Sequence, residues 1–230
     1  MDLLTLVGQV TKKRGEYFTQ AKNLALKVKT LEKLEEVMNS RAKTIVKAFH
    51  GKEIRWEEYF RSIVDETITS ALASVYLGAG SSSPEKKLER AWPVVTGKML
   101  PPLVDFLNQT EQALQNGSLL VGDTTVEFQE LFEESPQDFL EGSLISWPRV
   151  LSRVVRYLAN PSYSFFSLGD YYVRREQGYK QMRRVPVQDR RTCPDCTRFG
   201  RLGWQTIGTL PMPGQDCRCY DQCRCRIEYR

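Results

Sequence analysis

Apolar residues recur every three or four positions along several long stretches of the chain, a period typical of amphipathic α-helices. Over residues 15–49 they form one stripe, interrupted by Glu35, and lysine and glutamate occupy the other faces. The stripe consists of Leu24, Val28, Leu31, Met38, Ala42, Ile45 and Phe49. The pattern predicts one long helix over 15–49 that ends at His50-Gly51, because glycine commonly follows the last helical turn.

That stripe has two interpretations. It is either the core face of a helical bundle or a surface that pairs in a coiled coil or a partner's groove. The bundle is favoured, since most stripes of this kind face a core.

Other apolar runs predict further helices, separated by segments rich in glycine, proline and asparagine. The predicted helices cover 54–77, 85–115, 146–158 and 167–184, and the second is interrupted at Pro93 and at Pro101-Pro102. The inward residues of 54–77 are expected to be Trp56, Tyr59, Ile63, Ile68 and Leu72. Residues 118–145 are expected to form a short helix with loops, and Asn160-Pro161 is expected to end the helix over 146–158. The sequence therefore predicts a mainly α fold: a helical body over 1–165, then a basic helix and a small cysteine-rich, zinc-knuckle-like unit with short strands over 166–230.

Charge is distributed unevenly along the chain, although the net charge is only +5. Residues 99–148 contain nine acidic residues and no lysine or arginine, whereas residues 171–230 contain thirteen basic residues and six acidic ones. The acidic segment and the basic tail are either solvated faces or surfaces for two different partners.

The sequence contains no run of eighteen apolar residues, so we expect no membrane span. Its first residues lack a basic region before the apolar stretch, and they lack a small-residue cleavage site, so we expect no signal peptide. We therefore expect the chain to be made and kept in a reducing cytoplasm. In that compartment clustered cysteines bind metal more often than they form disulfides.

All six cysteines lie in the last forty residues: Cys193, Cys196, Cys217, Cys219, Cys223 and Cys225. A Cys-x-x-Cys pair followed about twenty residues later by further thiols suits a tetrahedral zinc ion. The protein's one histidine is His50, far from this cluster, so the site would be all thiolate, which favours structural over catalytic zinc. Zinc would also hold together a unit with few large apolar side chains. Disulfides, free thiols and a redox role for the Cys-x-x-Cys pair are the alternatives, and six thiols allow either two spare cysteines or two metals with bridging sulfurs.

Residues 183–230 resemble the C-terminal end of tailed-phage minor head proteins, the head-morphogenesis family typified by the F protein of phage Mu. The first part of the family pattern is a "D-x-R-T-C-x-x-C" segment followed by a glycine, and the second is a proline turn before a closing "C-R-C". The matching residues are Asp189, Arg191, Thr192, Cys193, Cys196, Gly200, Pro211, Pro213, Gly214, Cys223, Arg224 and Cys225. The chain departs from the pattern where many members have a histidine, since it carries the additional pair Cys217 and Cys219.

The resemblance implies a virion protein present in few copies, assembled in the host cytoplasm and associated with portal, capsid or neck proteins, with possible contact to phage DNA. Basic residues beside aromatic ones suit such contacts with phosphates. The candidates are Arg174, Arg175, Lys180, Arg183, Arg184, Arg190 and Arg191. Alternatively, these arginines serve the fold and pair with acidic residues of the body.

We therefore expect a structural protein that acts in head morphogenesis, portal-associated assembly, or DNA packaging or ejection. The alternative function is a nucleic-acid-binding zinc protein with a regulatory or packaging role. We do not expect an enzyme or a small-molecule substrate, because the chain has no usable histidine constellation, no phosphate-binding glycine loop and no G-x-S-x-G motif.

Overall fold

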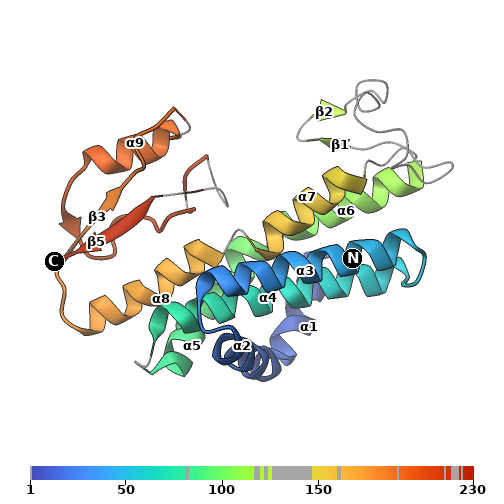
Figure 1. The fold of residues 1–230 in the computed structure, drawn as a ribbon, viewed down its shortest axis with the longest axis horizontal. Coiled ribbons are helices and arrows are strands. Elements are labelled where there is room, and N and C mark those ends of the chain that lie inside the picture. Colours follow the sequence, from blue (N-terminus) through green and yellow to red (C-terminus); the bar gives the residue numbers. More distant parts are fainter. Residues whose placement is uncertain are drawn as a thin grey trace.

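The computed structural model describes residues 2–80, 83–116, 120–121, 124–125, 147–159, 162–190, 192–214, 216–218, 223 and 225–230. Cys219, Arg191 and the predicted break at Asn160-Pro161 lie outside these residues, as does most of 118–145. The described part of that segment forms a short antiparallel pair, β1 (Leu120–Val121) and β2 (Thr124–Thr125), where the sequence predicted a short helix and loops. Among the described residues the fold is mainly helical with one small three-stranded sheet, which confirms the predicted fold class (Figure 1).

Residues 2–80 form four helices: α1 (Leu3–Lys12), α2 (Arg14–Val28), α3 (Leu31–His50) and α4 (Trp56–Ala79). The prediction of one helix over 15–49 is wrong. Lys29 has a left-handed backbone, with φ 66°, and ends α2. The hydroxyl of Thr30 then accepts a hydrogen bond from the backbone N–H of Lys33, which starts α3. The apolar stripe nevertheless faces the core of the bundle on both helices, since Leu24 and Met38 are both buried.

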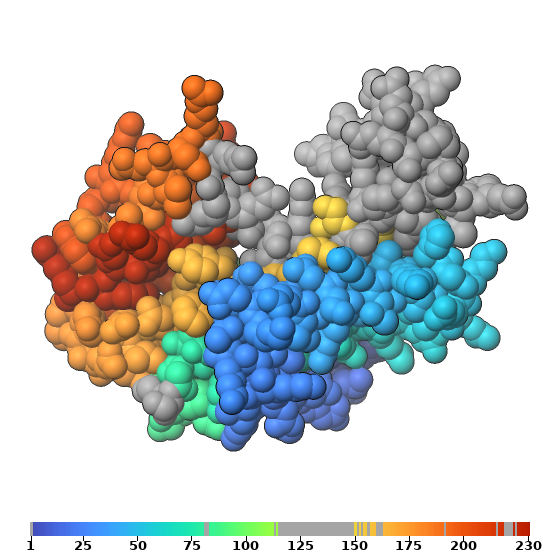
Figure 2. All heavy atoms as spheres, in the orientation of Figure 1, coloured from blue at the N-terminus to red at the C-terminus, as the bar shows by residue number. Residues whose placement is uncertain are grey.

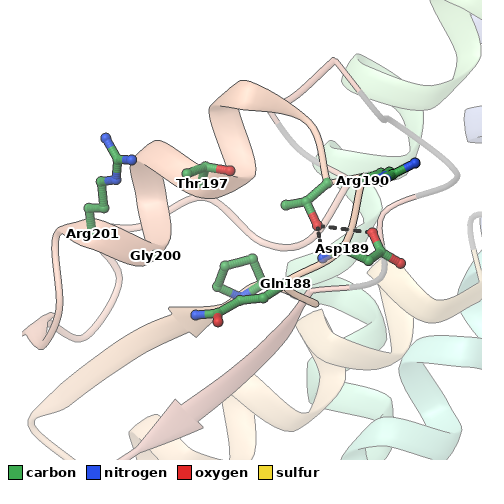
Figure 3. A pocket seen from close by; sticks show the side chains of 8 residues that line it. Gln188, Asp189, Arg190, Thr197, Gly200 and Arg201 are labelled. Atoms are coloured by element: carbon green, nitrogen blue, oxygen red, sulfur yellow. Dashed lines mark hydrogen bonds between the residues drawn. The ribbon is translucent and has the colours of Figure 1, made fainter.

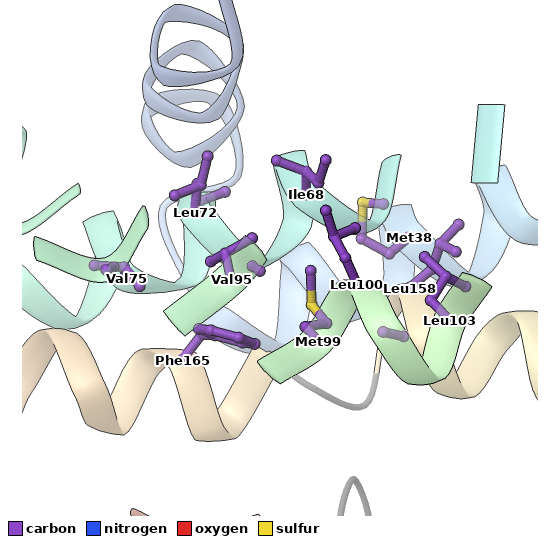
Figure 4. Packing of buried hydrophobic residues seen from close by; sticks show 14 of the residues in the cluster. Met38, Ile68, Leu72, Val75, Val95, Met99, Leu100, Leu103, Leu158 and Phe165 are labelled. Atoms are coloured by element: carbon purple, nitrogen blue, oxygen red, sulfur yellow. The ribbon is translucent and has the colours of Figure 1, made fainter. Parts of the chain in front are cut away.

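Helix α4 lies at the centre of the body, and α2, α3, α5, α7 and α8 pack around it (Figure 1). Residues 67–75 are all buried, so this part of the helix has no solvent-facing side. Of the residues predicted to face inward, Trp56 is partly buried and the others are buried. Figure 4 shows Ile68 and Leu72 of α4 in the same core as Val95 and Leu100.

The next helical stretch consists of α5 (Pro84–Val94), the π-helical turn η1 (Val95–Met99) and α6 (Leu100–Asn116). Helix α5 continues through Pro93 to Val94, so the predicted interruption does not fall at this proline, and η1 begins two residues after it. The predicted break at Pro101-Pro102 is wrong, and the helix continues through both prolines. They directly follow the π turn, where the regular hydrogen-bond ladder is already interrupted.

Helix α7 (Trp147–Leu158) confirms the helix predicted over 146–158, and α8 (Ser162–Glu176) then packs along α4. Two glycines allow these backbones to meet. A Cβ atom on Gly78 of α4 would lie 2.0 Å from the carbonyl oxygen of Phe166, and one on Gly169 of α8 would lie 2.3 Å from that of Val75. Any side chain at either position would force the two helices apart.

The helix predicted over 167–184 is wrong at its C-terminal end. Helix α8 ends at Glu176, Gly178 adopts a left-handed φ of 87°, and the chain continues as the strand β3 (Gln181–Val185). The expected boundary between residues 165 and 166 falls inside α8, which packs on the body. We call residues 179–230 the tail unit.

Within the tail unit β3 is the central strand, antiparallel to β4 (Gln205–Thr206) and β5 (Arg226–Tyr229), and α9 (Pro194–Arg201) packs beside it. Figure 2 shows the tail unit as a lobe that rests on α8 at one end of the body. None of the described helices is long and apolar enough to cross a membrane.

Candidate metal centre

The tail unit brings together cysteines that are far apart in the sequence. Cys196 lies on α9, whereas Cys223 and Cys225 directly precede β5. All three are buried, and their sulfur atoms lie within 4.8 Å of one another. The sulfurs of Cys196 and Cys223 are 3.7 Å apart. Four sulfurs that bind one zinc ion tetrahedrally at about 2.3 Å are separated by about 3.8 Å, so the cluster can bind a metal ion.

The Cys-x-x-Cys pair adopts the turn expected of a knuckle. Cys193 is the N-cap of α9, and its sulfur accepts a hydrogen bond from the backbone N–H of Cys196 at 3.4 Å. Pro194 occupies the first helical position, where its missing N–H costs nothing. Asp195 accepts the backbone N–H of Arg218 at 3.0 Å, which ties α9 to the segment that carries Cys217.

The six predicted ligands therefore fall into three groups. Cys196, Cys223 and Cys225 form the buried cluster. Cys193 is half-buried at the start of the same helix, and Cys217 is buried and hydrogen-bonds to Cys223. Cys219 lies outside the described residues. None of the five described cysteines forms a disulfide.

Arg184 was predicted to contact nucleic acid, and the structure corrects this prediction. Its side chain is only 1% exposed, so a phosphate cannot reach it. Its Nη2 atom donates hydrogen bonds to the sulfurs of Cys223, Cys217 and Cys196 at 3.0, 3.1 and 3.5 Å. The cause is the strand: β3 alternates between its two faces, so Met182 and Arg184 point inward while Arg183 points outward.

The guanidinium and the sulfurs stabilise one another electrostatically. Hydrogen bonds from Cys217 and Cys225, together with the charge of Arg184, hold the pKa of the Cys223 thiol far below its usual range. Hydrogen bonding to Cys223 and burial raise the pKa of Cys225. Desolvation opposes the charge of Arg184, but the sulfurs of Cys223 and Cys217 outweigh it and raise the pKa of the guanidinium. These contacts favour the thiolate form of Cys223 and the protonated form of Cys225.

The remaining residues predicted to bind nucleic acid differ in their surroundings. Arg174 pairs with Asp170, and Arg183 pairs with Glu228 and stacks on Trp204. The exposed ones are Arg175, Lys180 and Arg190, and Arg191 lies outside the described residues.

A hollow of about 690 Å³ lies beside α9 and is lined in part by Pro186, Gln188 and Asp189 (Figure 3). Arg190 and Arg201 flank it on opposite sides of the view, and Thr192 and Thr197 add hydroxyl groups. Arg198 lines an adjoining hollow that shares Arg201. Within the described parts of the chain, neither Arg190 nor Arg201 pairs with a carboxylate. The sequence analysis did not single out Arg198 and Arg201, although both lie in the basic tail.

Comparisons of the chain with models of protein families, with curated proteins and with solved structures found no significant match.

Proposed function

We propose that the tail unit is a structural zinc knuckle whose metal fastens α9 to the segment that leads into β5. The observation that carries this proposal is the buried cluster of Cys196, Cys223 and Cys225, with its sulfur separation of 3.7 Å. Thiolate ligands favour zinc among the common divalent ions, and a buried site built from thiolates suits a structural role. The proposal assigns no catalytic step to the chain.

Cys193 and Cys217 are the described candidates for the fourth ligand. Cys193 has the Cys-x-x-Cys spacing to Cys196, and Cys217 already contacts Cys223. Serine substitutions at each position, followed by cobalt spectroscopy, distinguish them. The loss of one thiolate from the coordination sphere changes the cobalt absorption, whereas a serine outside the sphere leaves the spectrum unchanged.

The decisive test of the metal is elemental analysis of protein purified without chelator, with a thiol titration on the same sample. We expect one or two zinc ions per chain, and thiols that react only after a chelator is added. Protein that contains no metal and has freely titrating thiols would refute the zinc proposal.

For the whole chain we propose a role as a virion structural component, a minor head or neck protein that binds portal or capsid proteins during head assembly in the host cytoplasm. Two observations support it. The segments that resemble the head-morphogenesis family, around Cys193–Cys196 and Cys223–Cys225, are the segments that converge on the cluster. The second is the body itself, in which α2, α3, α5, α7 and α8 pack around α4 and leave their outer faces for neighbouring proteins.

The test is the composition of particles produced from the genome that encodes this chain. Mass spectrometry of purified particles should detect the chain in a few copies per particle, and a deletion should reduce the yield of filled heads. Absence of the chain from purified particles, with normal yield after the deletion, would exclude this role.

The hollow beside α9 favours a second candidate function, binding to the nucleic-acid backbone. Arg190 and Arg201 have no carboxylate partner among the described residues, whereas Arg198 pairs with Asp195. Asp189 is the acidic residue of the lining, and no aromatic side chain lines the hollow for base stacking. These features suit salt-dependent contacts with duplex phosphates. In titrations at several salt concentrations, R190Q and R201Q should each lower the salt slope of DNA binding by about one. R61Q, which removes an exposed arginine of α4, is the control and should leave the slope unchanged.

A further inference from the structure

Arg184 is among the largest fully buried side chains of the described protein, although it carries a permanent positive charge. It forms no ion pair with a carboxylate among the described residues. A guanidinium removed from water requires a compensating negative charge, or the fold that buries it is disfavoured. The groups around Arg184 therefore indicate what compensates it.

Those groups are mostly sulfur atoms. A single nitrogen, Nη2, contacts three cysteine sulfurs at 3.0 to 3.5 Å, whereas Nη1 reaches only the carbonyl oxygen of Pro211, at 3.4 Å. The guanidinium carbon also lies 5.0 Å from the centre of the Phe199 ring. The Nε atom has no acceptor among the described residues. The side chain thus directs its hydrogen bonds to the thiols of two separate segments, α9 and 217–223.

We propose that Arg184 is a positioning residue of the metal centre. Its hydrogen bonds hold the sulfurs of Cys196, Cys217 and Cys223 together, and its charge offsets part of the negative charge that four thiolates leave on a divalent ion. The arginine thereby raises the affinity of the centre for metal. This inference rests on the proposed metal site but assigns a function to a residue outside the ligand set.

The adjacent residue provides a matched control. Arg183 has the same charge and lies on the same strand, but on the other face of the sheet, where it pairs with Glu228 and stacks on Trp204. R183M and R184M therefore change the net charge equally. Only the second removes hydrogen bonds to sulfur.

The experiment measures the zinc affinity of the full chain by competition with a chromophoric chelator. Side chains that hydrogen-bond to metal ligands typically raise the metal affinity about 10-fold to 100-fold. R184M should therefore weaken zinc binding by about 10-fold to 100-fold. R184K should lose less, because lysine retains the charge but not the planar arrangement of donors. R183M should bind zinc with the wild-type affinity.

A second measurement avoids the risk that R184M fails to fold. In wild-type protein with labelled arginine, the guanidinium signals of Arg184 should move when zinc is added, and those of Arg183 should not. The inference is overturned if R184M binds zinc as tightly as wild type, if R183M weakens binding equally, or if the Arg184 signals do not respond. A wild-type chain that takes up no zinc would instead refute the proposed metal site, and the inference with it.

Discussion

The crossing of α4 and α8 makes a sharp prediction for the substitution Gly78→Ala. The alanine Cβ would lie 2.0 Å from the carbonyl oxygen of Phe166, and Cβ atoms essentially never approach other atoms within 3.0 Å. The contacted atom belongs to the backbone of α8, so no side chain can rotate away. The two helices must therefore separate by about 1 Å or more.

The magnitude follows from two opposing effects. Overpacking of this kind costs about 3 kcal/mol, the upper part of the usual range. The cost is high because separating α4 from α8 also weakens the dispersion contacts between their neighbouring side chains. Alanine regains about 1 kcal/mol over glycine through its higher helix propensity. Gly78→Ala should therefore lower the free energy of unfolding by about 2 kcal/mol, which corresponds to a decrease in Tm of about 4–8 °C for a chain of this size.

The assay is thermal and urea-induced unfolding followed by circular dichroism, with Gly8→Ala as the control. Gly8 lies on an exposed face of α1, and a Cβ there would meet nothing within 4 Å. This control should raise the stability by about 1 kcal/mol, since only the propensity changes. If Gly78→Ala is as stable as Gly8→Ala, the backbones of α4 and α8 do not meet at this glycine and the argument fails.

Three other predictions concern the start of α3, the contact of α5 with α8, and the tail unit. Thr30→Ala removes the N-cap of α3 and should lower the free energy of unfolding by about 1 kcal/mol in urea titrations, and an unchanged midpoint would contradict the capping role. Lys87, fully buried, and Arg90 hold the pKa of Glu176 below its ordinary value of 4.5. The stabilisation of the fold by the ionised Glu176 is therefore complete above that value and is lost as the pH falls through the folded-state pKa. Glu176→Gln should reduce the dependence of Tm on pH in acid titrations. An identical pH profile of the variant and the wild type would refute this. Removal of zinc by a chelator should expose the tail unit to proteases while the body resists, and equal resistance with and without chelator would count against the metal staple.

Several features of the fold could be predicted from local patterns. The helical period predicted the mainly α class and the approximate position of α4 and α7, because the spacing of side chains on a helix depends only on local geometry. The break at Lys29 was missed because lysine rarely adopts a left-handed backbone, although Thr30 is a common N-cap residue. The end of α8 was missed for a similar reason: the arginines at 183 and 184 suit a helix, and only their pairing with β5 makes them a strand.

The sequence alone determined that a thiol cluster would form in a basic tail, since all six cysteines lie within the last forty residues. Only the tertiary structure decided which of them meet. The turn at Cys193 and the strands β3 and β5 bring Cys196 to Cys223 and Cys225. The same sheet separates two adjacent arginines, so that Arg183 faces outward and Arg184 reaches the sulfurs. The physical reason is that chain spacing limits which groups can meet, whereas strand pairing sets the face on which each side chain lies.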